Sequence, residues 1–483
     1  MKDKSKVNNA AAKKLMLPLG LAMLAVVMAA VFVFVSIRYA NLRLTDGTGI
    51  LGSALLLIAS FTAFALYLIL FRGDIIRDAK KMLLISICLL ACSLASQLTY
   101  YVDVCFSPML LAVLLTALLV DKGAAIAEAL LCSVISGVIT VCFRSNGAFD
   151  SAFAAVVFFN AFSGLVAVFS LGMRSTRSTP VIASVLGGIA GMAAFIAVML
   201  LDNALFIEYW RHLLWLIGSA LLCGILTVGL MPLFETVFDV ATDARLNEYL
   251  NNNNPLLKRL MLEAPGTYHH SMIVSSLAEA AAEEIGANAL LCKVSAYYHD
   301  VGKLRSPQCF KENQRPGYNI HDELDPYESA QRIIAHQHDG VVLLTKHRIP
   351  SAVIKIVSEH HGDSVMVYFY DKALKSAPEG EKVDESKFRY PSQKPSSKES
   401  AIIMLADCCE AAVRSMPNPT MDDIAAKVRD VITHKWDKRD SMLWASPLTF
   451  KEICSIEDSF IRTFAALHHE RVEYPDLDEV DVR

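Results

Sequence analysis

The most informative stretch of the chain reads Tyr297-Tyr298-His299-Asp300-Val301-Gly302-Lys303. Its His-Asp dipeptide belongs to a wider group of residues of the kinds that bind metals. The other members of this group are His270, His336, His360, His361 and Asp407. The chain has thirteen histidines, and nine of them fall between residues 269 and 361. Imidazoles and carboxylates at such density suit two divalent ions that share a bridging water, so the pattern favours a metallohydrolase.

The two adjacent pairs of this group are each suited to a shared ion. Neighbouring residues on a helix project about 100° apart, so His299 and Asp300 are each expected to face one of two neighbouring ions. The two carboxylate oxygens of Asp300 make it the natural bridge between them. The pair His360 and His361 falls at the end of an expected helix, where the two rings approach one ion from two directions.

The remaining members of the group lie in apolar surroundings. His336 is flanked by Ile333, Ile334 and Val341, so an imidazole facing inward there needs a partner. Asp407 follows the apolar run 402–406, which carries its carboxylate into the expected core. A buried carboxylate without a partner is costly, and a bound metal ion removes that cost.

The composition places part of this chain in a membrane. It has 483 residues, of which 54% are hydrophobic, and the apolar residues are concentrated in the first half. The formal net charge of -4 gives no indication of a nucleic-acid polymer as partner. Eleven cysteines occur without a CxxC pair, and many lie in apolar stretches, so we expect buried thiols rather than a disulfide framework.

Eight apolar segments are readable in the first half of the chain. They cover roughly 15–37, 49–71, 82–101, 107–120, 124–142, 151–173, 179–201 and 212–233. Most of them approach the ~20 residues that a helix needs to cross a bilayer. The fourth is short, so seven spans with one re-entrant piece remain an alternative.

The charges of the connecting segments predict the orientation. With the N-terminus inside, the inside segments carry twelve Lys and Arg residues and the outside loops carry four. This asymmetry predicts a multi-pass protein of the cell membrane with both termini in the cytoplasm.

The second half of the chain is predicted to be all-helical and outside the bilayer. We divide the sequence into 1–48 (N-terminal tail, first span and short outer loop), 49–233 (a seven-span membrane domain), 234–265 (an amphipathic connector) and 266–483 (a cytoplasmic domain). The helical periodicity of the last part predicts helices at 270–286, 289–301, 325–347, 351–361, 399–415, 420–436 and 448–469. The stretch 371–398 is rich in Lys, Ser, Pro and Glu, and we expect a long surface loop there.

The motif at 297–303 resembles the core of the HD phosphohydrolase superfamily. Further stretches resemble the membrane-anchored cyclic di-AMP phosphodiesterases of the PgpH type. They are Pro265-Gly266-Thr267-Tyr268-His269-His270-Ser271, Glu359-His360-His361-Gly362, Phe388-Arg389-Tyr390-Pro391 and Met404-Leu405-Ala406-Asp407. The resemblance implies a multi-span membrane region joined to an all-helical cytoplasmic HD domain that hydrolyses cyclic di-AMP to linear pApA.

The resemblance also implies the two ligand sets. One ion would be held by His270, His299, Asp300 and Asp407, and the other by Asp300, His336, His360 and His361. The ions implied are iron or manganese. Family members usually carry a large extracellular domain between the first two spans, whereas residues 38–48 join those segments directly here.

The expected chemistry is metal-assisted hydrolysis of a phosphodiester. We assign His299, Asp300 and Lys303 as catalytic, and Lys303 and Arg414 as substrate-binding. A solvated surface position for Lys303 and an ion pair between Arg414 and Glu410 are the competing interpretations.

Cyclic di-AMP follows from the resemblance alone, because the residues themselves support only phosphate-ester hydrolysis. Cyclic di-GMP and guanosine tetraphosphate are the alternative substrates. A membrane receptor that binds a nucleotide without cleaving it is the alternative of a different class. The sequence does not indicate an oligomeric state.

Overall fold

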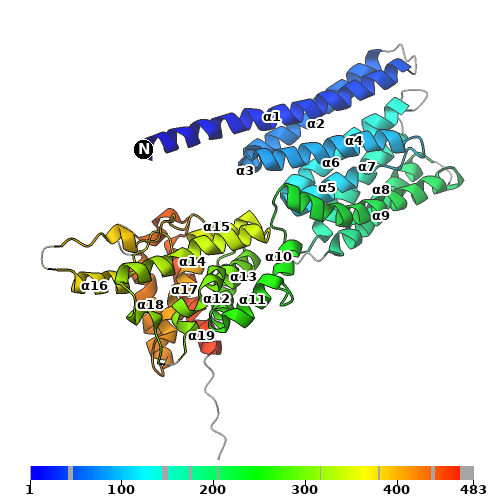
Figure 1. The fold of residues 1–483 in the computed structure, drawn as a ribbon. Helices are drawn as coiled ribbons and strands as arrows, with labels where there is room; N and C mark the ends of the chain where they lie inside the picture. Colours follow the sequence, from blue (N-terminus) through cyan, green and yellow to red (C-terminus); the bar gives the residue numbers. More distant parts are fainter. Residues whose placement is uncertain are drawn as a thin grey trace, which may run out of the picture. The chain divides into compact units, whose positions relative to one another are not determined.

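The computed structural model describes residues 2–41, 47–143, 151–172, 177–203, 206–315, 317–378, 381–436 and 441–467. The chain forms two compact units, Met1–Ala244 and Arg245–Arg483. Figure 1 shows that both are built from helices. Among the described residues there is no strand, and a single isolated bridge joins Val365 and Arg389. The predicted all-α class is confirmed.

The first unit contains the apolar helices. They are α1 (Lys2–Asn41), α2 (Gly47–Phe71), α4 (Ala79–Thr99), α5 (Met109–Leu119), α6 (Lys122–Phe143), α7 (Ser151–Ser170), α8 (Thr179–Leu201) and α9 (Phe206–Val237), with the short α3 (Gly73–Ile76) after α2. Within the described residues, seven of them are long and apolar enough to cross a membrane, and α5 is the shorter eighth. Large apolar side chains such as Leu55, Phe169 and Leu201 are exposed on this unit. Such a surface suits contact with lipid rather than water.

The segment 103–121, which contains the short helix α5, carries the chain from one end of this bundle to the other. Asp121, just after α5, accepts a hydrogen bond from Arg72 at 2.8 Å, and Arg72 lies before α4. Asp103, just before α5, lies 2.8 Å from His212 near the start of α9. Because α4 separates Arg72 from Asp103 by about 30 Å of helix, the two contacts mark opposite ends. The structure therefore favours a traversing α5 over a re-entrant one.

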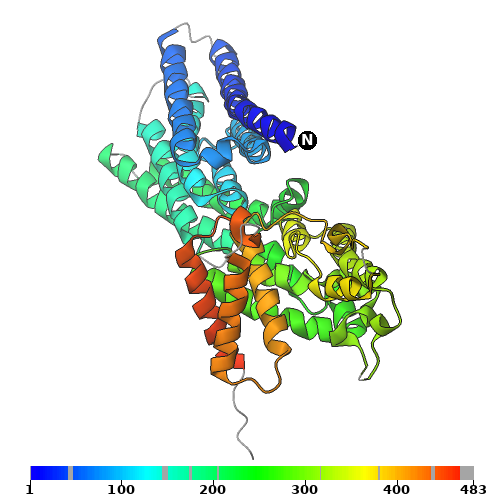
Figure 2. The ribbon, with the colours of Figure 1, turned by 90° about the vertical axis from the view of Figure 1, so that its left-hand side faces the viewer.

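The second unit is an all-helical domain. Its helices are α10 (Asp243–Tyr249, which begins in the first unit), α11 (Pro255–Glu263), α12 (Pro265–Glu284), α13 (Ala289–Tyr298), α14 (Pro326–Lys346), α15 (Ser351–Glu359), α16 (Val367–Ser376), α17 (Lys398–Arg414), α18 (Met421–Trp436) and α19 (Phe450–Leu467). Six 3-10 turns are also described: η1 (Val301–Arg305), η2 (Pro307–Cys309), η3 (Lys311–Asn313), η4 (Ile320–Asp322), η5 (Glu385–Phe388) and η6 (Met442–Ala445). Figure 2 shows α17, α18 and α19 side by side in orange to red.

The core of this unit lies between α12, α13, α17, α18 and α19. Val274, Leu277, Leu405 and Phe460 are among its fully buried side chains. Every residue from Ala401 to Ala406 is buried, so α17 runs through the core as the apolar sequence predicts. This packing carries the next residue of α17, Asp407, to the middle of the domain.

Several bounds in the second unit differ from the sequence prediction. Helix α12 begins at Pro265, five residues before the predicted start at 270. The expected loop at 371–398 is wrong in part, because α16 extends to Ser376 and η5 forms at Glu385–Phe388. Phe388 and Tyr390 are buried in a small apolar cluster with Ile334 and Phe369, which holds this polar stretch against α14. Helix α13 ends at Tyr298, three residues earlier than expected. Of the expected connection at 38–48, residues 42–46 lie outside the described part of the chain.

Candidate metal centre

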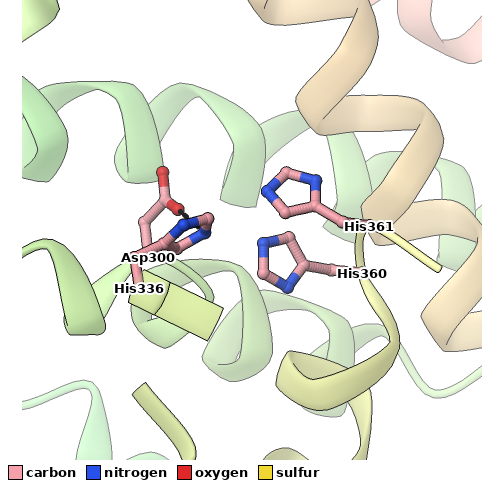
Figure 3. Close-up of side chains that lie close together, drawn as sticks. All are labelled: Asp300, His336, His360 and His361. Carbon is pink, nitrogen blue, oxygen red and sulfur yellow. Dashed lines mark ion pairs between the residues drawn. The ribbon is translucent and has the colours of Figure 1, made fainter. Parts of the chain in front are cut away.

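The seven predicted ligands come together in the second unit. They form two groups in which the ligand atoms lie within 4.8 Å of one another. One group is Asp300, His336, His360 and His361, and the other is His270, His299 and Asp407. Figure 3 shows the first group, with Asp300 and His336 facing the pair His360 and His361. The first group equals one of the sets that the family resemblance implies, and the second equals the other set without the shared Asp300. The role of these residues as ligands stays a prediction.

Asp300 lies between the two groups. Its Oδ1 is 3.3 Å from His336 Nε2. Its Oδ2 is 3.3 Å from His299 Nε2 and 3.6 Å from His270 Nε2. The two oxygens of one carboxylate therefore face different histidine sets, which is the arrangement that a bridging ligand requires.

The turn that carries Asp300 differs from the predicted helix. His299 caps the C-terminus of α13, just after its last residue Tyr298, and Asp300 precedes the 3-10 turn η1. This turn lies so close to α14 that a Cβ on Gly302 would fall 1.8 Å from the carbonyl oxygen of His336. Glycine is needed here for close approach, and it brings Asp300 within reach of His336.

Asp407 completes the other group from α17. Its Oδ1 lies 3.1 Å from His270 Nε2 and 3.8 Å from His299 Nε2. Its Oδ2 lies 3.8 Å from His361 Nδ1. Asp407 thus contacts histidines of both groups. It is buried because it directly follows the buried apolar run Ala401–Ala406 of α17.

Three of the histidines are oriented by the same kind of local hydrogen bond. The Nδ1 of His299, His336 and His360 hydrogen-bonds to the carbonyl oxygen three residues earlier, at 2.7, 2.5 and 2.6 Å respectively. A carbonyl accepts only, so Nδ1 carries a proton and Nε2 is the nitrogen that faces the centre. The three Nε2 atoms are buried without a hydrogen-bond partner. Inward-facing imidazole nitrogens of this kind fit a divalent metal once they are deprotonated.

Glu410 is a site residue that the sequence analysis did not select. It lies three residues after Asp407 on α17, and its Oε2 is 2.5 Å from His270 Nδ1. This contact leaves His270 Nε2 facing Asp407. The i, i+3 spacing from Asp407 was the available sequence signal, because it places both carboxylates on one helix face.

Arg414 lies behind Glu410 rather than beside the histidines. Its Nε is 3.5 Å from Glu410 Oε1, and its side chain is 43% exposed. This is the ion pair that was the competing interpretation. Glu410 is buried and contacts His270, so this ion pair connects a partly exposed guanidinium to the histidine centre.

Lys303 is buried beside Asp300, and the solvated interpretation is wrong. Its Nζ lies 2.6 Å from Asp300 Oδ2 and donates to Glu312 Oε1 at 2.7 Å. The ring of Phe310 covers the same ammonium at 4.8 Å. Glu312 lies nine residues after Lys303 in a different 3-10 turn, so helical periodicity in the sequence does not indicate this contact.

Two aromatic residues border the centre. The ring of Tyr390 stacks on His361 at a centroid distance of 4.3 Å, and Phe310 meets His336 edge to face at 5.6 Å. Phe310 also lines a cavity of about 830 Å³ together with Lys311, Arg315, Tyr318 and Tyr368. Phe310 therefore lies between His336 and a cavity that has basic and aromatic side chains in its lining.

The ionised carboxylates of the centre favour the binding of a cation. Burial alone would raise the pKa of Asp407, but its contacts with His270 and His299 hold it well below the usual value. Burial would lower the pKa of His299, but Asp300 and Asp407 raise it to about 10. Burial lowers the pKa of His360 to about 3. The carboxylates thus stay ionised and draw a proton onto His299, while His360 stays neutral, as metal binding requires.

Two family models match this chain. One describes a 7TM receptor with intracellular HD hydrolase and covers residues 48–242, and the other describes an HD domain and covers residues 267–412. The first half of the chain thus matches the membrane part of a seven-span HD family, and the second half matches an HD domain. An HD domain implies binding of divalent metal ions, and the two clusters provide residues that fit them.

The chain is similar to two curated proteins named cyclic-di-AMP phosphodiesterase PgpH. The protein from Listeria monocytogenes is 39% identical over 68% of this chain and 45% of its own length. The protein from Bacillus subtilis is 40% identical over 65% of this chain and 44% of its own length. The chain thus spans less than half the length of these relatives.

A crystal structure of the L. monocytogenes PgpH HD domain in complex with cyclic-di-AMP is also similar. It is 43% identical, and the match covers 45% of this chain and 100% of that chain, with a TM-score of 0.43.

Proposed function

We propose that this chain is a membrane-bound, metal-dependent phosphodiesterase that hydrolyses cyclic di-AMP to linear pApA. The observation that carries this proposal is that the buried Nε2 atoms of His299 and His336 converge on Asp300 and Asp407, with His360 in the same cluster as Asp300. Sequence similarity to the two curated phosphodiesterases supports the choice of substrate.

In this proposal each of the two ligand sets holds one ion, and Asp300 belongs to both sets. His270, His299, Asp300 and Asp407 hold one ion, and Asp300, His336, His360 and His361 hold the other. When bound, two such divalent ions supply a hydroxide near neutral pH and neutralise charge on the phosphodiester. We propose iron or manganese, because nitrogen and oxygen donors without sulfur suit these metals.

The surrounding residues of the chain hold these ligands in position. The tied Nδ1 atoms fix the rings of His299, His336 and His360, and Glu410 fixes His270. Lys303 is proposed to keep Asp300 ionised and to offer its remaining N–H to a phosphate oxygen of the substrate. The proposed substrate contact of Arg414 is the weaker of the two, because its guanidinium already lies near Glu410.

The cavity beside Phe310 is the proposed place for one nucleoside of the substrate. Its aromatic rings offer stacking surfaces for a base, and Lys311 and Arg315 offer positive charge for a phosphate. Its volume of about 830 Å³ lies within the range of ligand pockets.

The orientation is also proposed. The excess of Lys and Arg in alternate connecting segments supports a bacterial cell-membrane protein with the N-terminus and the HD domain in the cytoplasm. The division at 1–48, 49–233, 234–265 and 266–483 is retained as the proposed domain organisation. The proposed partners are the cyclic dinucleotide and the lipid bilayer, without a nucleic-acid polymer.

The test is a turnover assay with the purified full chain in detergent. Cyclic di-AMP, cyclic di-GMP and guanosine tetraphosphate are supplied separately with Mn²⁺ or Fe²⁺, and the products are separated by chromatography. We expect pApA from cyclic di-AMP and about two bound ions per chain. Preferred cleavage of another nucleotide would replace the substrate, and tight binding of cyclic di-AMP without any cleavage would establish a receptor instead.

A further inference from the structure

A second group of metal-ligand residues lies in the first unit. Asp103 and Cys105 belong to the connection between α4 and α5, and His212 lies near the start of α9. A carboxylate oxygen, the thiol sulfur and a ring nitrogen of these residues lie within 4.8 Å of one another. More than one hundred residues separate His212 from the other two in the sequence, so the fold itself brings them together.

The spacing of the donor atoms suits a shared ion. His212 Nδ1 lies 2.8 and 2.9 Å from the two carboxylate oxygens of Asp103. Two ligands at about 2.0–2.2 Å from one zinc ion lie roughly 3.0–3.5 Å apart, so a small movement admits the ion between them. The backbone N–H of Cys105 donates to Asp103 Oδ1 at 2.8 Å, which fixes the carboxylate relative to the thiol.

The burial of the three side chains is graded. Cys105 is 2% exposed and packs in an apolar cluster with Phe159 and Phe195. The side chains of Asp103 and His212 are 12% and 35% exposed. The thiol is therefore surrounded by protein, whereas the imidazole is partly exposed. An ion can reach the site from the imidazole side.

The donor set selects the class of ion. A thiolate, an imidazole and a carboxylate together suit Zn²⁺ and similar divalent transition metals, whereas Ca²⁺ and Mg²⁺ prefer oxygen donors alone. Three protein ligands leave a fourth position for water, the pattern of an open zinc site. We propose that Asp103, Cys105 and His212 form a site for a zinc-class divalent ion, separate from the centre in the HD domain.

The site lies near the start of a long helix, α9, that runs to the end of the apolar bundle. It lies at the end where α9 begins, opposite the end marked by Arg72 and Asp121. From His212, α9 continues as one helix to Val237, about 38 Å away, where the chain leaves the apolar bundle. An ion bound at Asp103 and His212 would thus tie the first turns of α9 to the α4–α5 connection.

The test is a Co²⁺ titration of the metal-depleted full chain in detergent. Co²⁺ bound by a thiolate gives a sulfur-to-cobalt charge-transfer band in the near ultraviolet. The proposed ligand sets of the HD domain contain no sulfur, so they do not contribute to this band. We expect a saturable band in the unchanged chain, its loss in Cys105→Ser, and at least about tenfold weaker binding in His212→Gln.

Cys408→Ser is the matched control, because Cys408 is partly exposed beside Asp407. The control is expected to keep the band. Thermal unfolding of the metal-free variants separates a lost ligand from a lost fold, and His212→Gln serves if Cys105→Ser does not fold. A chain without the band, or a band that survives in Cys105→Ser and disappears in Cys408→Ser, overturns the proposal. In that case Asp103 and His212 form an ion pair only.

Discussion

Replacing Glu410 with glutamine is expected to weaken one of the two ions of the HD domain and to spare the other. Glu410 is 2% exposed, and its Oε2 lies 2.5 Å from His270 Nδ1. Glutamine keeps the size of the side chain and an acceptor oxygen, but it removes the charge that makes the His270 ring a stronger donor. Loss of such a partner behind a metal ligand costs 10–100-fold in affinity, or about 1.4–2.7 kcal/mol.

The assay is calorimetric titration of the metal-depleted full chain with Mn²⁺, fitted with two sites. The ion held by His270, His299 and Asp407 is expected to bind 10–100-fold more weakly, while the ion held by His336, His360 and His361 keeps its affinity. Turnover is expected to fall at limiting Mn²⁺ and to recover in excess Mn²⁺.

The matched control is Glu452→Gln. Glu452 lies on α19 and pairs with Lys398 at the start of α17, nine residues before Asp407. This control is expected to keep both affinities. If Glu410→Gln binds two ions as tightly as the unchanged chain and unfolds at the same temperature, the role of Glu410 in orienting His270 is refuted.

Three further predictions follow from the same geometry. Asp300→Ala is expected to lower turnover by at least about 10²–10³-fold and to release one or both ions; full turnover, or unchanged metal content by elemental analysis, contradicts the bridging role. Gly302→Ala is expected to destabilise the fold by about 1–3 kcal/mol or more, because its Cβ would meet the carbonyl oxygen of His336. Gly73→Ala is the control in thermal unfolding, since its Cβ meets no atom within 4 Å, and equal unfolding temperatures would refute the close approach. In the metal-free centre Asp300 and Asp407 outweigh burial and raise the pKa of His299 to about 10, so a proton competes with the metal at neutral pH. Metal affinity is therefore expected to rise about tenfold per pH unit for each proton displaced, below pH 10, and titrations in buffers of different ionisation enthalpy measure the proton release.

The parts of the site that sequence reasoning reached are those with a local cause. The apolar run before Asp407 is enough to bury that carboxylate, and the flanking Ile333 and Ile334 indicate that His336 lies in a helix with an apolar face. Helix α15 ends at Glu359, two residues before the predicted end at 361, so His360 and His361 lie just after the helix rather than in its last turn.

The parts that were missed depend on contacts between distant segments. Glu312 reaches Lys303 across a series of 3-10 turns that has no sequence period. Tyr390 lies in a polar stretch that reads as exposed, and it is buried only because Phe388 and Phe369 pack beside it. The early end of α13 at Tyr298 follows from the close approach of Gly302 to α14, which single-helix periodicity does not encode.

The Nδ1 hydrogen bonds of His299, His336 and His360 imply that the donor atoms are in place before any ion arrives. Each ring is held by the carbonyl of its own preceding turn, so its direction depends on local backbone geometry and not on the occupant of the centre. Little conformational entropy is then lost on loading, unlike a zinc finger, which folds only around its ion. Occupancy of the proposed centre would then follow the supply of free metal, and loading would require no refolding of the domain.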